Sequence, residues 1–169
     1  MNNIPFTLSQ VRPVRDAMTV SRPSGLSYEV PVTWFSLGAG TSITPEYYDC
    51  TTIYLGGEGN GRFLLGADGQ EVSVKPGELL YVPPKTLCGT KTDNGMIYTE
   101  IILKKENFTM NDMIKAGQPT ELKELISYEE GSIANLDIAH ADNMKFVLMA
   151  FDEGTGLTPH RAPGNAILT

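Results

Sequence analysis

Polar and hydrophobic side chains alternate along much of this chain, a pattern that predicts β-strands. In residues 46–54, a strand would direct five side chains to one face: Glu46, Tyr48, Cys50, Thr52 and Tyr54. Residues 96–103 alternate in the same way, and Glu100 shares a face with apolar neighbours. We predict that the first face lines a pocket, and that Glu100 either reaches solvent at an edge or points inward as a polar anchor.

Turn-forming residues separate the strands at short intervals. Asp68-Gly69 supplies the positive φ that a tight hairpin needs, so residues 67–70 are expected to join two strands. The glycines of residues 56–61 are expected to form another break. Short strands with regularly spaced turns are typical of a double-sheet jelly roll, so we predict an all-β barrel of antiparallel strands.

Changes in the pattern of residue types divide the chain into four parts. Residues 1–23 contain Pro5, Pro13 and Pro23 and are predicted to be an extended arm with edge strands and no helix. Residues 24–105 are expected to form the barrel and residues 106–131 a connector with a short helical turn. Residues 132–169 again have a residue pattern typical of β-strands.

This last part repeats the first. Residues 154–160, GTGLTPH, align without a gap with residues 40–46, GTSITPE, and five of these seven positions are identical or differ only as Ile and Leu. A duplication explains this match. Because the second copy is short, we expect either a fragment of a longer protein or strands that complete a sheet in the first domain or in a partner subunit. Unpaired strand edges are sticky, which favours a homodimer.

Composition and charge narrow the classes of function. The chain has 169 residues, 41% of them hydrophobic, and a net charge of −7. The hydrophobic fraction is typical of a globular domain. The negative net charge argues against nucleic acid or an anionic membrane as a partner. There is neither a signal-peptide pattern nor an apolar run of about 20 residues, so we predict a cytoplasmic protein. Cys50 and Cys88 are too few for a disulfide framework and are expected to be buried thiols.

Two spaced motifs resemble those of the cupin superfamily. The first cupin motif reads G-x5-H-x-H-x3-E-x6-G, and its spacing is kept by Gly40, Glu46, Tyr48, Thr52 and Gly59. The second reads G-x5-P-x-G-x2-H-x3-N, and its spacing is kept by Gly77, Pro83, Lys85, Cys88 and Thr92. The resemblance implies an RmlC-like double-stranded β-helix, and the repeat then implies a bicupin whose second copy is incomplete.

At the metal-ligand positions the chain departs from the family. The ligands that the resemblance implies are replaced in the first copy by Glu46, Tyr48, Thr52 and Cys88, so we expect no cofactor in the first barrel. In the second copy His160 stands at the first histidine position, but Ala162 and Ala166 replace the next two ligands. One histidine cannot hold a metal alone. A divalent metal is therefore expected only in a complete second cupin; the candidate ligands in the chain as a whole are His160, Glu46 and Cys88.

Two classes of function follow. The first is a barrel that binds a small organic molecule or serves as a structural and dimerisation scaffold, with pocket candidates Glu46, Tyr48, Cys50, Thr52, Tyr54, Cys88 and Glu100. The alternative is an enzyme of the kinds found among cupins, either metal-dependent, such as a dioxygenase or isomerase, or metal-free and based on proton transfer. It would use Glu46, Tyr48 and Cys88 or, in a complete protein, His160. A carboxylate could act as a base near neutral pH only if burial raised its pKa.

Overall fold

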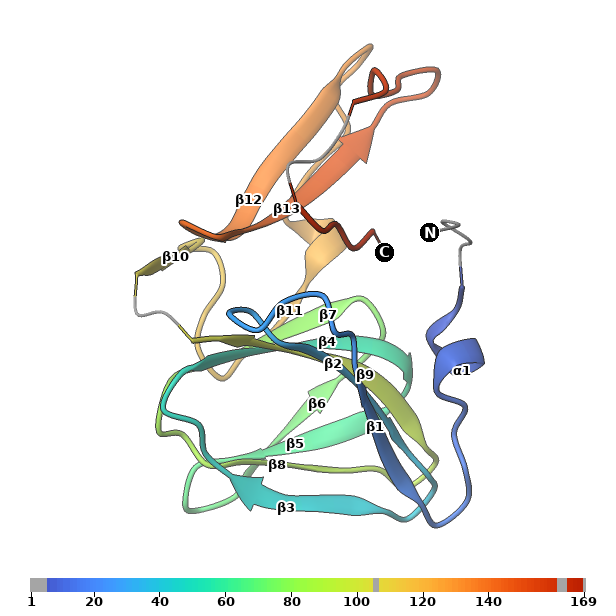
Figure 1. Ribbon diagram of the computed structural model, residues 1–169, viewed down its shortest axis with the longest axis vertical. Coiled ribbons are helices and arrows are strands. Elements are labelled where there is room, and N and C mark those ends of the chain that lie inside the picture. Colours follow the sequence, from blue (N-terminus) through green and yellow to red (C-terminus); the bar gives the residue numbers. More distant parts are fainter. Residues whose placement is uncertain (1–5, 105–106, 161–163, 169) are drawn as a thin grey trace.

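Two antiparallel sheets face each other and form a barrel, as the computed structural model shows for residues 6–104, 107–160 and 164–168 (Figure 1). The six-stranded sheet has the order β1 (Thr19–Pro23), β2 (Val32–Leu37), β9 (Met96–Leu103), β4 (Thr51–Gly59), β7 (Glu78–Val82) and β11 (Pro119–Glu121). The four-stranded sheet has the order β3 (Ser42–Glu46), β8 (Cys88–Lys91), β5 (Gly61–Leu65) and β6 (Gln70–Val74). The predicted all-β jelly-roll barrel is confirmed.

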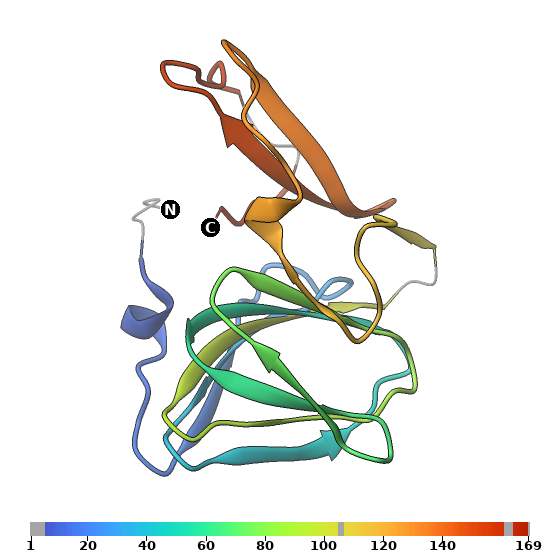
Figure 2. The ribbon, with the colours of Figure 1, turned by 180° about the vertical axis from the view of Figure 1, so that it is seen from behind.

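A third sheet projects from the barrel. It consists of β10 (Phe108–Met110), β12 (Ile133–Ala141) and β13 (Met144–Phe151), in that order. Seen from behind, the β12–β13 hairpin extends well beyond the barrel, and the 3₁₀ helix η1 (Leu122–Glu124) lies between the two (Figure 2). The segment predicted as a connector thus contributes β10 to this sheet and β11 to the barrel.

Two hydrophobic clusters hold these layers together. The first fills the barrel and takes side chains from both sheets, including the fully buried Leu37, Phe63 and Leu80. The second lies between the outer face of the six-stranded sheet and the third sheet, where Ile53 and Leu79 pack with Ile138. The outer face is apolar as well, so both faces of β4 and β7 are covered.

The N-terminal arm differs from its prediction. Residues Leu8–Val11 form a short helix, α1, whose start is fixed by a capping box: Gln10 N donates to Thr7 Oγ1 at 3.3 Å, and Thr7 N donates to Gln10 Oε1 at 2.9 Å. The prediction of no helix was wrong because two reciprocal side-chain bonds stabilise a turn that lies between the prolines. The predicted edge strand is present as β1, which has β2 as its one neighbour among the described strands.

The predicted single strand over residues 46–54 is interrupted. β3 ends at Glu46 and β4 begins at Thr51, because the chain crosses between the two sheets at residues 47–50. The crossing is held by a bond from Lys85 N to Tyr48 O at 2.8 Å. Alternation in the sequence does not reveal such a crossing, because the residues on both sides keep a strand conformation.

The glycines predicted as a loop lie inside a strand. β4 runs through Gly56 and Gly57 to Gly59, with a bulge between Gly56 and Glu58. Glycine is required there by a close approach: a Cβ added to Gly56 would collide with the backbone carbonyl oxygen of Lys75. The prediction of a break was wrong because the glycines serve packing and not a turn.

Gly56→Ala is therefore expected to lower the free energy of unfolding by about 1–3 kcal/mol, as overpacking does. Gly156→Ala is the matched control, since no atom lies within 4 Å of its added Cβ. Urea denaturation of both variants measures the difference. Equal stability of the two would contradict the close contact.

The β12–β13 hairpin repeats the β1–β2 hairpin in register. In the first hairpin Thr19 lies opposite Leu37 and Pro23 opposite Thr33. The residues 114 positions later pair in the same way, Ile133 opposite Phe151 and Asp137 opposite Val147. The offset is the one at which residues 40–46 align with 154–160.

The bonds that follow each hairpin repeat at the same offset. Thr41 Oγ1 donates to Gly38 O at 2.7 Å, and Thr155 Oγ1 donates to Asp152 O at 2.7 Å. Gly38 N donates to Met18 O, and Asp152 N donates to Ser132 O. Gly40 and Gly154 both have positive φ, 69° and 77°. The turn after each hairpin therefore has the same backbone conformation, although residues 156–160 do not form a strand as their counterparts in β3 do.

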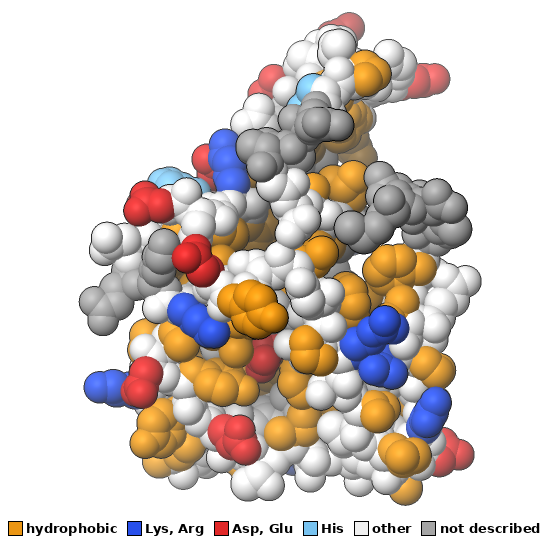
Figure 3. Space-filling view, in the orientation of Figure 1, with side chains coloured by type: hydrophobic (Ala, Val, Ile, Leu, Met, Phe, Trp, Pro, Cys, Tyr) orange, Lys and Arg blue, Asp and Glu red, His pale blue; other side chains and the backbone are white. Residues whose placement is uncertain are grey.

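The surface carries no dense basic patch on the face shown in Figure 3, where the blue side chains lie apart among hydrophobic and acidic ones. Within the described ranges, no helix is long and apolar enough to cross a membrane.

Candidate ligand-binding site

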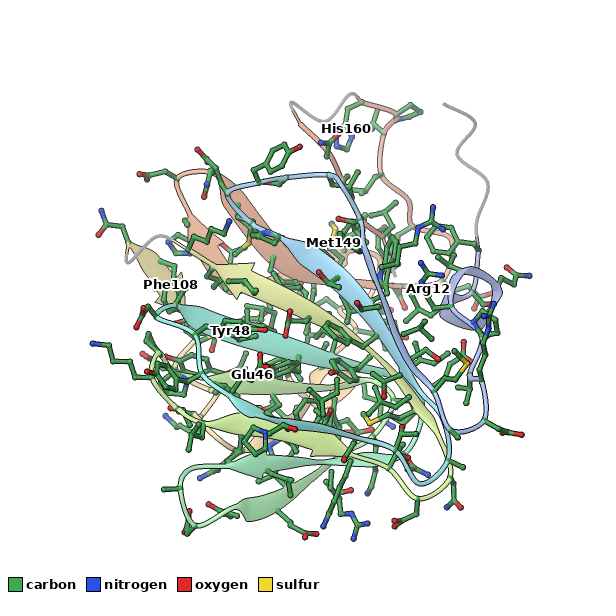
Figure 4. The ribbon with its side chains drawn as sticks, turned by 60° about the horizontal axis from the view of Figure 1, so that its bottom comes forward. Arg12, Glu46, Tyr48, Phe108, Met149 and His160 are labelled. Atoms are coloured by element: carbon green, nitrogen blue, oxygen red, sulfur yellow. The ribbon has the colours of Figure 1, made fainter. Side chains whose placement is uncertain are left out.

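The candidate residues lie where the two sheets of the barrel come together. Glu46, the last residue of β3, is opposite Cys88 of β8, while Tyr54 of β4 is opposite Glu100 of β9. Tyr48 lies on the crossing between the two sheets. Figure 4 shows Glu46 and Tyr48 next to each other on the same side of the barrel.

Burial increases along this set from the edge of the barrel inward. Glu46 is exposed, Tyr48, Cys50 and Cys88 are half-buried, and Tyr54 and Glu100 are 5% and 6% exposed. Of the two alternatives for Glu100, the structure shows the inward polar anchor. Thr52 is buried on the same face of β4 as Tyr54.

Glu100 is a buried carboxyl group. Burial raises its pKa to about 7, the nearby Glu46 contributes in the same direction, and a hydrogen bond with Tyr54 opposes the shift. The group therefore exchanges its proton near neutral pH. In its protonated form it can donate a hydrogen bond, and in its ionised form it can only accept.

The side chains of Tyr48, Tyr54 and Cys88 remain protonated at neutral pH. Burial, followed by the charges of Glu100 and Glu46, raises the pKa of Tyr48 to about 12. Burial raises the pKa of the Cys88 thiol to about 11, although a hydrogen bond with Tyr54 lowers it. Burial also raises the pKa of Tyr54. A thiol of this kind is neither a good nucleophile nor a ready metal ligand, because both roles need the thiolate.

Aromatic rings fill the barrel beneath this polar set. The rings of Phe35 and Tyr98 are stacked with centroids 5.0 Å apart, and the Phe63 ring lies 4.7 Å from that of Tyr54 and 5.4 Å from that of Tyr98. These rings belong to the inner hydrophobic cluster. Glu46, Tyr48 and Cys88 thus form the mouth of a filled barrel, and the buried Tyr54 and Glu100 lie inside it.

Sequence reasoning did not include Tyr98 and Phe63 in the site. Tyr98 shares a face with Glu100 in the alternation of residues 96–103, and that signal could have identified it. Phe63 lies in a hairpin without any motif, so its position near Tyr54 follows only from the packing of one sheet on the other.

The three candidate metal ligands do not come together, because Glu46 and Cys88 lie opposite each other on β3 and β8 while His160 lies apart from them. Among the described residues, no three His, Cys, Asp or Glu side chains form a group that could hold a metal ion. His160 is exposed, and its Nδ1 lies 2.8 Å from Thr158 O. Figure 4 places it far from Glu46 and Tyr48. The other two ligand positions of the second copy are occupied by alanines. Ala162 lies outside the described residues, and Ala166 is exposed.

Comparison with solved structures identifies the fold. A Cupin 2 conserved barrel domain protein from Leptotrichia buccalis matches with a TM-score of 0.80 and 21% identity, covering 96% of this chain and 71% of its own. A cupin superfamily protein from Desulfitobacterium hafniense has a TM-score of 0.57 and 23% identity, covering 62% of this chain and 94% of its own. A Streptococcus pyogenes protein of unknown function has a TM-score of 0.56 and 16% identity, covering 63% of this chain and 91% of its own. No family model and no curated protein sequence matches the chain.

Proposed function

We propose that this chain, whose barrel has the cupin fold, binds a small organic molecule at the barrel mouth through hydrogen bonds and without a metal. Glu100 is the observation that carries the proposal. A buried carboxyl group costs stability unless it is well paired, and here it has Tyr54 as a neutral partner and Glu46 as a repelling neighbour. Titratable groups with shifted pKa values gather at functional sites, so the cost is explained if Glu100 binds a ligand.

The chemistry of the mouth suits a ligand that offers both donors and acceptors. The phenols of Tyr48 and Tyr54 and the thiol of Cys88 keep their protons and donate, while the exposed Glu46 accepts. Glu100 adapts, since it can donate or accept. The aromatic rings below provide an apolar floor, as in most small-molecule sites.

The test starts from untagged protein purified at neutral pH. Native mass spectrometry would detect a co-purified molecule, and a thermal-shift panel of amines, sugars, phenols and carboxylic acids would detect a ligand that raises the melting temperature. Absence of any bound mass and of any stabilising compound would favour a purely structural barrel over the proposal.

Tyr48→Phe is expected to weaken binding of such a ligand about three- to tenfold, the effect of losing one hydrogen bond. The free protein should keep its stability, because Tyr48 is only half-buried and lies on the crossing between the sheets, outside any strand. Tyr47→Phe is the control: Tyr47 is the neighbouring residue and is 60% exposed. Titration calorimetry of the three proteins measures the effect, and equal losses in both variants would count against the mouth as the site.

A second candidate function is metal-free proton transfer by Glu100. Its pKa near 7 supplies what sequence reasoning required of a carboxylate base. Such an enzyme would convert the ligand that mass spectrometry or the thermal-shift panel detects. Glu100→Gln would then abolish turnover, while Tyr48→Phe would mainly weaken binding.

We also propose that the chain is duplicated and that its last part is the opening of a second cupin repeat. The in-register hairpins and the repeated threonine and backbone bonds support the duplication. His160 stands where the first copy has Glu46, so a metal held with the help of this residue would need ligands from outside the described residues.

A further inference from the structure

Two carboxyl groups approach each other at the barrel mouth from opposite sheets. Glu46 ends β3 of the four-stranded sheet, and Glu100 lies on β9 of the six-stranded sheet. Glu46 is exposed and Glu100 is buried, and the charge of Glu46 acts on Glu100. Tyr48, on the crossing between the sheets, is within reach of both charges. The three side chains therefore converge on one space.

Within the described ranges, no basic side chain neutralises these two carboxyl groups. Every charge that acts on Tyr48 comes from an acidic group, namely Glu100, Glu46, Cys88 and Cys50. Lys85 bonds to the crossing through its backbone N–H, and the residue is exposed. Basic side chains pair with carboxylates elsewhere on the surface: Arg62 with Asp93, Lys91 with Glu71, Lys123 with Glu121 and Lys145 with Asp137. The mouth thus carries negative charge that the described part of the chain does not offset.

A buried hydroxyl group beside this space also lacks a partner. Thr90 is 3% exposed, and its Oγ1 makes no hydrogen bond to any described residue. Thr90 follows Cys88 by two residues on β8, so both side chains point to the same side, the barrel interior. The Tyr98 hydroxyl lies near Thr90 but not in hydrogen-bond geometry, and the charge of Glu100 acts on the same phenol. Because an unpaired buried polar group costs stability, the Thr90 hydroxyl is an acceptor available to a ligand.

Aromatic rings border the same space. The ring of Tyr54, which lies opposite Glu100, meets the ring of Tyr98 edge-on with centroids 5.8 Å apart. Aromatic faces attract cations and also provide contacts for carbon atoms, which favours an organic cation. A metal ion fits less well, because no three His, Cys, Asp or Glu side chains form a group in the described part of the chain.

We propose that the ligand of the barrel mouth is a small organic amine, which binds as an ammonium ion between Glu46 and Glu100 while its carbon atoms contact the neighbouring tyrosine rings. The inference rests on the proposed function, since it names the class of ligand for the same site. A primary ammonium group has three N–H donors, which suit the two carboxylates and a third acceptor such as Thr90. It also offsets the repulsion between the carboxylates, which a neutral or anionic ligand cannot do.

A matched series of probes tests the class of ligand. Propylamine, 1-propanol and propionate have the same chain length and differ in charge. Each is titrated into the untagged protein at constant ionic strength, with ¹³C-labelled glutamate so that NMR follows the carboxyl signals even when binding is weak. Propylamine should shift the signals of Glu46 and Glu100 and bind at least about tenfold more tightly than the other two probes, as expected for hydrogen bonds between charged groups.

Glu46→Gln should weaken propylamine binding about tenfold, because one of the two charged partners is lost. Its fold should be unaffected, since Glu46 is exposed. Glu130→Gln is the matched control: it removes an exposed carboxylate from another part of the chain and should leave binding unchanged.

The pH dependence gives the sign of the ligand's charge. Glu100 has a pKa of about 7 in the free protein, and a bound ammonium ion favours its ionised form. Propylamine stays protonated and must displace the proton of Glu100, so its affinity should rise about tenfold from pH 6 to pH 8. The other groups that face Glu100, on Tyr48, Tyr54 and Cys88, keep their protons over this range. A ligand that accepts a hydrogen bond from protonated Glu100 would show the opposite trend.

Equal binding of the three probes, or tighter binding of propionate, would overturn the amine while leaving the proposed function intact if Tyr48→Phe weakens that binding. An affinity for propylamine that Glu46→Gln leaves unchanged, or that falls from pH 6 to pH 8, would also overturn it. Propylamine that leaves the carboxyl signals unshifted would overturn it as well. The proposed function fails together with it only if no co-purified molecule and no stabilising compound is found either.

Discussion

Glu100→Gln is expected to raise the free energy of unfolding by about 3 kcal/mol near pH 8, while the two proteins should be almost equally stable below pH 4.5. Glutamine has nearly the same shape and keeps a group that can hydrogen-bond to Tyr54. It removes the carboxylate, whose burial is the main cause of the raised pKa. Urea denaturation at several pH values measures the difference.

The sign follows from the two pKa values. The carboxyl group titrates at 4.5 when exposed and at about 7 in the folded protein. Between these values the unfolded chain releases its proton and the folded chain keeps it, so stability falls as the pH rises. Above pH 7 both states are ionised, and the loss remains constant. The contribution of Glu100 to the free energy of unfolding is therefore most favourable below pH 4.5.

Glu130→Gln provides the control for this experiment, because Glu130 is exposed. It should change stability by less than about 0.5 kcal/mol at every pH. A difference between wild type and Glu100→Gln that does not vary with pH would contradict the burial of an ionisable group at this position. A gain in stability together with loss of ligand binding would show that Glu100 is kept for binding and not for folding.

Phe63→Ala is expected to lower the free energy of unfolding by about 3–5 kcal/mol, a large part of the stability of a domain of this size. The Phe63 side chain is fully buried and contacts the rings of Tyr54 and Tyr98. Its removal leaves a cavity that the neighbouring sheet can close only in part.

Tyr128→Ala is the matched control for loss of an aromatic ring, because Tyr128 is 74% exposed. It should cost less than about 0.5 kcal/mol in the same denaturation experiment. A loss below about 1 kcal/mol for Phe63→Ala would mean that the barrel interior is not the packed core described above.

Local patterns predicted strands where polar and apolar residues alternate regularly, as in the first half of β4. Thr52 and Tyr54 point inward as the alternation indicates, since β4 is regular at that point. Prediction failed for the continuity from Glu46 to Cys50, because the crossing between two sheets depends on where the second sheet lies. It failed for Gly56 for a similar reason, since the Lys75 carbonyl group comes from a different part of the chain.

The spacing of glycines and prolines indicated the fold although the metal ligands of the resembling family are replaced. Turn positions are set by backbone conformation, and Gly40 and Gly77 keep the positive φ that such turns need. The residues between the turns are free to change chemistry, so the spacing of a motif can persist when the residues at its ligand positions change.

The sequence by itself determined the β-barrel and the repeat, because strand alternation, turn glycines and matching segments are local properties of the chain. Only the tertiary structure decided that Glu100 is buried opposite Tyr54 and that aromatic rings fill the barrel, since both depend on contacts between distant strands. The pairing of β13 with β12 alone among the described strands likewise became visible only there. Whether a strand has neighbours on one side or on both is a property of the sheet and not of the strand.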